Sequence, residues 1–224
     1  AKVIRSSDGS SERIRCFGTA YSLFQNFFPF SNYAHWCGWR PFPPTLSIQN
    51  LEYHHKLMNT NKTLIFCTSY AENNDQWTQR YKKWLDFVKK SSLERSQILI
   101  IDDGSPVLPD WSDLSIFREP NLPEAVNNEC ALFHFNSRLG RSSLLNYPGW
   151  YRSYTFASIW AKQYNFNKII HIESDSFIFS ERLTTHINQL NSGWTSLYCP
   201  SQNLPENCIQ IICEDQIKKF IKRS

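Results

Sequence analysis

Short runs of consecutive apolar residues recur from residue 63 onwards, and they alternate with segments in which apolar residues return every three or four positions. The first pattern is typical of strands buried on both faces, and the second of amphipathic helices. The predicted strands, in chain order, are "TLIFCTSY", "QILIIDDGS", "ALFHF", "KIIHI", "WTSLYC" and "IQIIC". Because strands that are apolar throughout alternate with helices, we expect an α/β fold with a mostly parallel central sheet and helices on both faces, a Rossmann-like α/β/α sandwich.

Four segments with helical spacing accompany these strands. Asn74 and Asp75 offer an N-cap to the first helix, "GWYRSYTFASIWAKQYN" predicts the second, Ser180 caps the third, and "EDQIKKFIKRS" predicts the last. Residues 1–61 show no regular period and concentrate aromatic residues and prolines. We therefore expect an irregular, aromatic-rich N-terminal appendage over 1–61 and a main domain over 62–224, with a chain that is compatible with one module of a longer protein.

The net charge limits the classes of partner, and the apolar segments and cysteines indicate the cellular location. The net charge is +4, too small to indicate nucleic-acid binding but compatible with an anionic small substrate or a loose association with acidic lipid. No segment has the apolar length of a transmembrane helix, and the N-terminus lacks the apolar region of a signal peptide. The 7 cysteines form no CxxC pair, which favours reduced thiols. We expect a cytoplasmic protein, with peripheral association at the inner face of a membrane left open.

Two acidic turns interrupt the apolar pattern. Asp102 and Asp103 follow the second predicted strand, and Glu173 and Asp175 follow the fourth. A buried carboxylate is costly unless it is paired, hydrogen-bonded or metal-bound, and ligands of parallel sheets bind beyond the carboxyl ends of the strands. We therefore expect both turns at the rim of a binding crevice, where a hard divalent cation can bridge carboxylate and phosphate oxygens.

Structural roles compete with this interpretation. Asp and Gly favour turns, so "DDGS" is also typical of a plain turn. Glu173 and Asp175 are also compatible with a helix cap and a salt bridge to Lys168 or Arg182. Arg138 and Arg141 suit a diphosphate or an acidic sugar, or a solvated surface. His171, inside a predicted strand, is interpreted as a core histidine.

Taken in order, "TLIFCTSYAEN", "ILIIDDGS", "GWYRSYTFASIWA" and "KIIHIESDSFIF" resemble the nucleotide-sugar half of the GT-A fold glycosyltransferases, most closely those of the family 2 type. The resemblance runs from residue 63 to about residue 179. It implies a nucleotide-sugar donor, a glycan acceptor such as a polysaccharide or a glycolipid, and Mn²⁺ or Mg²⁺ held with the diphosphate by an Asp-x-Asp-like motif.

Carried over by position, the resemblance implies roles for individual residues. Thr68 and Tyr70 line the nucleoside pocket, Asp103 contacts the base, and Asp102 supports Asp103. Arg152 matches the family's arginine and braces either Asp103 or the diphosphate, and the family's glycine corresponds to Gly149.

In the second acidic turn, Asp175 is the implied direct metal ligand. Glu173 stands where the family has Asp, and is a second candidate ligand or a contact to the ribose or a metal-bound water. Ser174 lies between them in the same donor-binding turn. For an inverting enzyme, "CEDQ" supplies Asp215, or else Glu214, as the catalytic base; a retaining enzyme needs none.

The function that these observations predict is metal-dependent transfer of a hexosyl or deoxyhexosyl group from a nucleotide-sugar donor to a carbohydrate acceptor. Three alternatives remain. A sugar nucleotidyltransferase uses similar carboxylates but needs a basic, glycine-rich phosphate loop, which "TLIFCTSYAEN" lacks. A non-catalytic carbohydrate-binding module would use the aromatic residues, which make up 15% of the chain. A pseudo-enzyme would bind the donor without a catalytic base.

Overall fold

The computed structural model describes residues 2–3, 62–201 and 203–221. The appendage expected over 1–61 therefore lies outside the described residues, apart from strand β1 (Lys2–Val3), which pairs in parallel with β7 (Ser176–Phe177). No helix in the described ranges is both long and apolar enough to cross a membrane.

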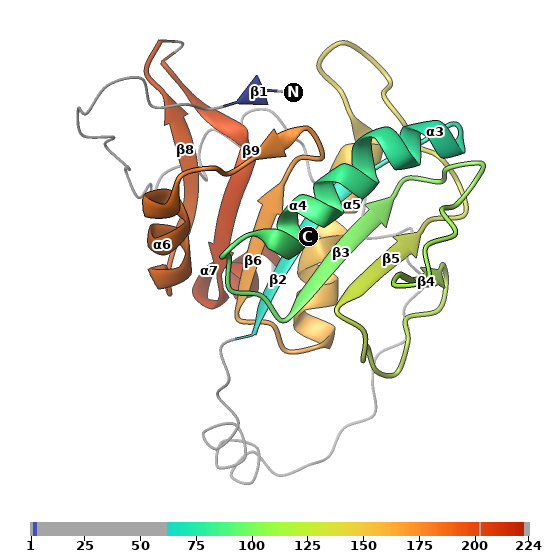
Figure 1. The fold of residues 1–224 in the computed structure, drawn as a ribbon, viewed down its shortest axis with the longest axis horizontal. Coiled ribbons are helices and arrows are strands. Elements are labelled where there is room, and N and C mark those ends of the chain that lie inside the picture. The colour runs from blue at the N-terminus through green and yellow to red at the C-terminus, as the bar shows by residue number, and fades with distance from the viewer. Residues whose placement is uncertain (1, 4–61, 202, 222–224) are drawn as a thin grey trace, which may run out of the picture.

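A seven-stranded sheet forms the centre of the molecule, in the order β4-β5-β3-β2-β6-β9-β8 (Figure 1). Its strands are β2 (Thr63–Ser69), β3 (Gln97–Asp102), β4 (Ser115–Arg118), β5 (Cys130–His134), β6 (Lys168–Ile172), β8 (Trp194–Cys199) and β9 (Leu204–Cys213). Strands β4, β5, β3, β2 and β6 are parallel, whereas β9 runs antiparallel to both β6 and β8. The predicted α/β fold with a mostly parallel sheet is confirmed.

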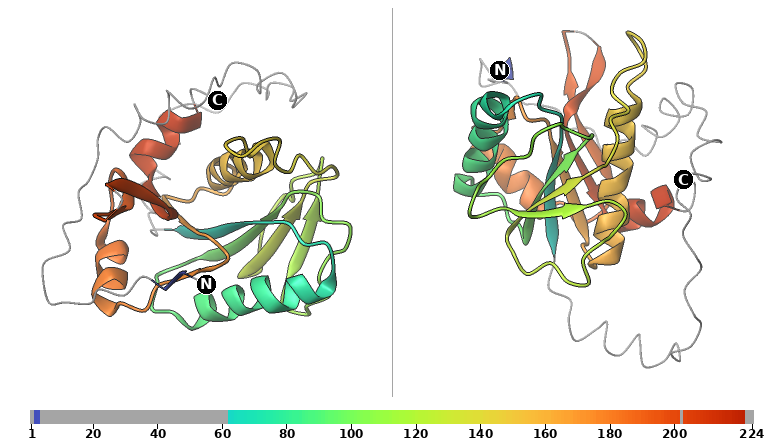
Figure 2. Two further views of the ribbon diagram at one scale, coloured as in Figure 1. Left: turned by 90° about the horizontal axis from the view of Figure 1, so that it is seen from above. Right: turned by 90° about the vertical axis from the view of Figure 1, so that its right-hand side faces the viewer.

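Helices cover both faces of this sheet (Figure 2). They are α3 (Asn74–Gln76), the π-helical turn η2 (Trp77–Lys82), α4 (Lys83–Lys90), α5 (Pro148–Gln163), α6 (Glu181–Gln189) and α7 (Glu214–Ile221). The helical run 74–90 and α6 pack on one face, and α5 and α7 on the other. Because side chains of a strand alternate between faces, β2 supplies Ile65 and Cys67 to the first core and Leu64 and Phe66 to the second. This two-sided burial is why the strands are apolar throughout.

One of the two predicted N-cap residues is confirmed, and the other cap lies one residue earlier than predicted. Ser180 caps α6 as predicted, since its hydroxyl accepts a hydrogen bond from the Leu183 N–H at 3.2 Å. The first helix is capped by Asn73 rather than by Asn74 or Asp75: the Asn73 side chain accepts from the Gln76 N–H at 3.0 Å. Asn73 has extended backbone, which lets its side-chain oxygen reach the first turn.

Candidate functional site

The sheet has a switch point between β2 and β6. From β2 the chain builds outward through β3 to β4 and β5, and then returns to place β6 on the other side of β2. At such a point the neighbouring connections run to opposite sides of the sheet, and ligands of open α/β sheets bind beyond the carboxyl ends of the strands there. Residues 70, 103 and 173–175 follow the ends of β2, β3 and β6, so the first acidic turn and the second lie at the same edge.

Asp102 is fully buried, and its carboxylate is hydrogen-bonded entirely within the protein. Its carboxylate accepts hydrogen bonds from the Ser69 hydroxyl at 3.2 Å, the Ser105 hydroxyl at 2.5 Å and the Ser105 N–H at 2.8 Å. The Nδ1 atom of His134, on the neighbouring strand β5, lies 2.7 Å from the same carboxylate. Asp102 therefore fixes the end of β3 and is not available to a ligand.

Asp103, the next residue, is held by the segment that leads into α5. Its oxygens accept hydrogen bonds from the N–H of Gly140 at 2.7 Å and of Leu139 at 3.4 Å, and from the Arg152 guanidinium. Only 5% of Asp103 is exposed. A Cβ on Gly149 would lie 2.0 Å from an Asp103 carboxylate oxygen, so only glycine fits there. The structure thus brings Asp103 together with Gly149 and Arg152, the two residues that the resemblance aligns with a glycine and an arginine.

Arg152 contacts more than the carboxylate. Its guanidinium also donates to the Ser137 carbonyl at 2.6 Å and lies 3.9 Å from the centre of the Phe135 ring. These contacts satisfy much of the guanidinium within the protein. They favour bracing of Asp103, one of the two roles implied for Arg152.

Tyr70 lies just beyond the end of β2, and Thr68 is half-buried near that end. The Tyr81 hydroxyl donates to the Tyr70 carbonyl at 2.9 Å and accepts from its N–H at 3.0 Å. The guanidinium of Arg138 stacks 3.6 Å from the centre of the Tyr70 ring. Burial raises the pKa of the Tyr81 phenol, so this hydroxyl stays protonated and keeps η2 attached to the switch point.

The second acidic turn presents one carboxylate to solvent. The Glu173 carbonyl accepts from the Ser176 N–H at 2.8 Å, and Ser174 is buried, whereas the Asp175 side chain is 52% exposed. The Asp175 carboxylate lies 3.9 Å from the guanidinium of Arg80, on η2. Lys168, one of the expected salt-bridge partners, instead donates to the last carbonyls of α6, and burial lowers its pKa.

Arg80 had not been singled out in the sequence. It directly precedes Tyr81, and its approach to Asp175 joins residues that are far apart in the chain. No local pattern marks such a pair. Two guanidinium groups thus lie near the ends of these strands: Arg80 faces the Asp175 carboxylate, and Arg138 stacks on the Tyr70 ring.

Asp175 and Glu173 are the two residues that would hold Mn²⁺ or Mg²⁺. Within residues 62–201 and 203–221, no three His, Cys, Asp or Glu side chains gather as a metal cage. Mg²⁺, however, is usually held by one or two carboxylates together with substrate phosphates and water. A half-exposed Asp175 with Glu173 two residues earlier fits this second mode of binding.

Glu214 and Asp215 are not at this edge. The end of β9, Cys213, pairs with the beginning of β6, so both acids lie at the amino ends of the parallel strands. Glu214 accepts from the Asn167 amide at 3.1 Å, and Asp215 from the Gly193 N–H at 2.9 Å. The five residues of β6 separate the two edges by roughly 16 Å, at about 3.3 Å per residue. Glu214 and Asp215 therefore lie at the opposite edge from the two acidic turns and are not placed as a catalytic base for them.

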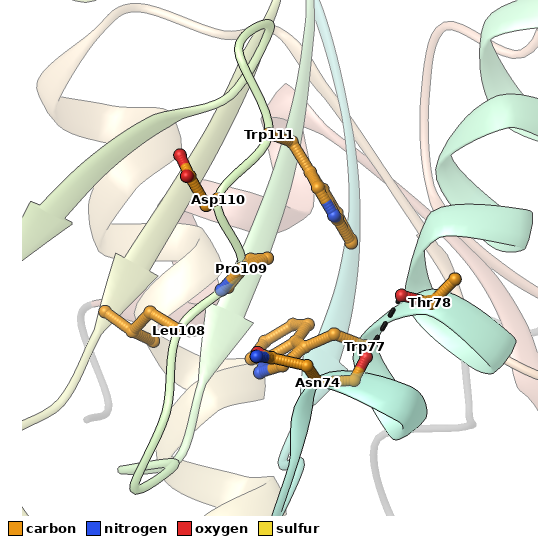
Figure 3. Close-up of a pocket in the computed structure, with 7 residues that line it drawn as sticks. All are labelled: Asn74, Trp77, Thr78, Leu108, Pro109, Asp110 and Trp111. Atoms are coloured by element: carbon orange, nitrogen blue, oxygen red, sulfur yellow. Dashed lines mark hydrogen bonds between the residues drawn. The ribbon is translucent and has the colours of Figure 1, made fainter.

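A separate hollow of about 250 Å³ lies between the first helical turn and the loop after β3 (Figure 3). Figure 3 shows the Trp111 indole pointing toward Thr78, with Pro109 beside it and the Asp110 carboxylate directed away from the helix. Apolar and polar side chains both line it, a combination that suits the two kinds of surface on a sugar ring. The lining residues are Asn74, Trp77, Thr78, Leu108, Pro109, Asp110 and Trp111.

Comparison of the chain with protein-family models, with curated proteins and with solved structures gives no match.

Proposed function

We propose that this protein is a metal-dependent glycosyltransferase of the GT-A type, which transfers a sugar from a nucleotide-sugar donor to a carbohydrate acceptor. The observation that carries the proposal is the position of Asp175. Its half-exposed carboxylate follows β6 at the switch point of the sheet, where it faces a guanidinium across a long contact of 3.9 Å. A carboxylate that is neither buried nor firmly paired at such an edge is suited to a ligand.

The other residues of the rim have complementary roles in this proposal. Asp103, buried and held by Arg152 and two backbone N–H groups, would fix the segment before α5 as one wall of the nucleoside site. The Arg138–Tyr70 stack forms an adjoining wall that is planar and positively charged. Asp175 and Glu173 would hold Mn²⁺ or Mg²⁺, which when bound would stabilise the charge that develops on the diphosphate leaving group. Together these groups recognise a base, a ribose and a pyrophosphate along one edge.

Calorimetric titration with nucleoside diphosphates, with and without Mn²⁺, tests the proposal. We expect at least one of UDP, GDP, ADP, CDP and dTDP to bind, and Mn²⁺ to tighten that binding. Asp175→Ala should abolish the effect of Mn²⁺. Asp215→Ala is the matched control, because it removes a carboxylate from the opposite edge of the sheet and should leave the titration unchanged. Absence of binding for all five nucleotides, or equal effects of the two substitutions, would contradict the proposal.

The Trp111 hollow supports the second candidate, a non-catalytic carbohydrate-binding module. Such a module binds glycans without nucleotide or metal. Titration with oligosaccharides in the presence of EDTA separates the two functions: retained glycan binding that Trp111→Ala removes, with no nucleotide binding, favours the module.

A further inference from the structure

The segment between β5 and α5 ends in an exposed apolar tip. Leu144 and Leu145 are 77% and 78% exposed, the highest values for large apolar side chains in the described part of the chain. Leu139 and Tyr147 flank them at 41% and 37%. In Figure 1 the yellow segment that leads into α5 extends beyond the ends of the strands, and the right view of Figure 2 shows the same projection. We call residues 139–147 the apical loop.

The apical loop is internally braced. Its turn is closed by hydrogen bonds from the Ser142 N–H to the Asn146 carbonyl at 3.0 Å and from the Tyr147 hydroxyl to the Leu144 carbonyl at 2.9 Å. The Arg141 guanidinium donates to the carbonyls of Ser143 and Leu144 at 2.7 and 2.8 Å, and lies 4.6 Å from the centre of the Tyr147 ring. The two leucines are therefore held outward by a defined turn.

The sequence around the leucines carries basic residues and no acidic ones. Arg138 and Arg141 lie in or next to the loop, and the chain contains no Asp or Glu between Glu129 and Glu173. A stable protein interface buries about 1,200 Å² or more over both partners, and it draws on a broader surface than two leucines at a projecting tip. Apolar side chains beside basic ones on a convex tip are instead typical of insertion into the interface of an anionic bilayer.

The base of the apical loop is part of the candidate site. The Gly140 N–H donates to Asp103, and the Gly140 carbonyl accepts from the Gly149 N–H at 2.9 Å. Leu204, at the start of β9, is 58% exposed and lies beyond the same edge, because Ile209 of β9 already pairs with the last residue of β6. Two apolar projections thus lie on the side of the sheet where the strands β2, β3 and β6 end.

We propose that the apical loop docks this protein on an anionic lipid surface, with Leu144 and Leu145 inserted and Arg141 beside the lipid phosphates. The crevice then faces the membrane. Resting on the proposed function, this orientation assigns the acceptor to glycans carried on a lipid, whereas docking itself does not depend on any nucleotide.

Co-sedimentation of the full chain with lipid vesicles tests the docking. We expect the wild type to bind vesicles of phosphatidylcholine with 30% phosphatidylglycerol, and to bind pure phosphatidylcholine vesicles much more weakly. The double substitution Leu144→Gln, Leu145→Gln should lower the partition coefficient about tenfold, because it removes the inserted apolar surface. Ile116→Gln is the matched control, since Ile116 is also exposed but lies on the edge strand β4.

Two further measurements separate the outcomes. Urea unfolding should give the same midpoint for the double variant and the wild type, which excludes loss of folding. Nucleotide titration of the double variant should match the wild type, so a failed proposed function and a failed docking are distinguishable. Equal sedimentation of wild type and double variant overturns the inference. So does a wild-type dimer in light scattering that the double variant dissociates, since the loop would then bind a second copy.

Discussion

The Asp103 carboxylate shows how closely single residues determine this site. Gly149 lies in the first turn of α5, where alanine is normally better than glycine by about 1 kcal/mol. A Cβ at this position would lie 2.0 Å from an Asp103 oxygen that also accepts from Gly140. Helix propensity therefore predicts that a methyl group at position 149 stabilises the fold, whereas steric overlap predicts that it destabilises the fold.

We expect Gly149→Ala to destabilise the fold by about 1–3 kcal/mol, because displacement of Asp103 outweighs the gain in helix propensity. The midpoint of urea unfolding measures this, provided that the slope stays constant. Thr155→Ala, within the same helix, is the control for propensity alone. Stabilisation by Gly149→Ala would mean that Asp103 moves aside freely.

His171 contributes a pH dependence that comes from burial. It is fully buried among the rings of Phe66, Trp150 and Tyr154, and this burial lowers its pKa to about 3, opposed in part by the backbone of Asn207. In the unfolded chain its pKa returns to about 6.5. Below pH 6.5 the unfolded chain therefore binds a proton that the folded chain excludes, and stability falls.

His171→Phe should remove this dependence. In the wild type, the free energy of unfolding should lose about 2 kcal/mol between pH 7 and pH 5 through this residue alone, and the variant should lose correspondingly less. Urea unfolding at the two pH values provides the comparison. If both proteins show the same pH dependence, His171 is not excluded from protonation.

At the level of elements, η2 connects the helical layer to the switch point. The Tyr81 hydroxyl holds both backbone groups of Tyr70, and the preceding residue, Arg80, reaches Asp175. The Arg80–Asp175 pair is half-exposed and long, so it contributes well under about 1 kcal/mol to stability. A pair this weak can exchange its partner for a ligand.

Arg80→Gln should therefore leave the urea midpoint nearly unchanged but weaken nucleoside diphosphate binding about tenfold, because the rim loses a cation that suits phosphate oxygens. Calorimetry provides the affinities. Lys83→Gln is the charge-matched control on the adjoining helix, where the side chain is exposed. An equal loss in both variants would assign the effect to net charge rather than to the position of Arg80.

Elements with strong local patterns were predictable from the sequence. The helical spacing of Trp77, Tyr81, Trp84, Leu85 and Val88 corresponds to a face that is entirely buried, and the Ser180 cap is present. Strands β4 and β7 were not expected. In β4 the residues are alternately half-buried and exposed, within a long proline-containing connection, and β7 has only two residues. Such short edge segments depend on their neighbours and not on their own composition.

At the level of the whole molecule, the direction of β9 decides which acids share a crevice. The apolar run "IQIIC" predicts a buried strand but not its direction, because continuous apolarity is the same in both orientations. Antiparallel pairing with β6 carries Glu214 and Asp215 to the far edge. The turns after β3 and β6 could be placed together from the sequence because both strands were correctly expected to be parallel.

The number of possible metal ligands predicts how metal removal affects the stability of the molecule. Because the described residues supply no cage of three ligands, a divalent cation would be held jointly with a diphosphate and would not support the fold alone. EDTA should leave the melting temperature of the free protein unchanged. In the presence of Mn²⁺, a nucleoside diphosphate at about 100 times its Kd should add about 2.7 kcal/mol, or roughly 5–10 °C. Differential scanning fluorimetry of wild type and Asp175→Ala measures both effects. A large loss of melting temperature with EDTA alone would instead indicate a structural metal, which a cation held jointly by Asp175 and a diphosphate does not predict.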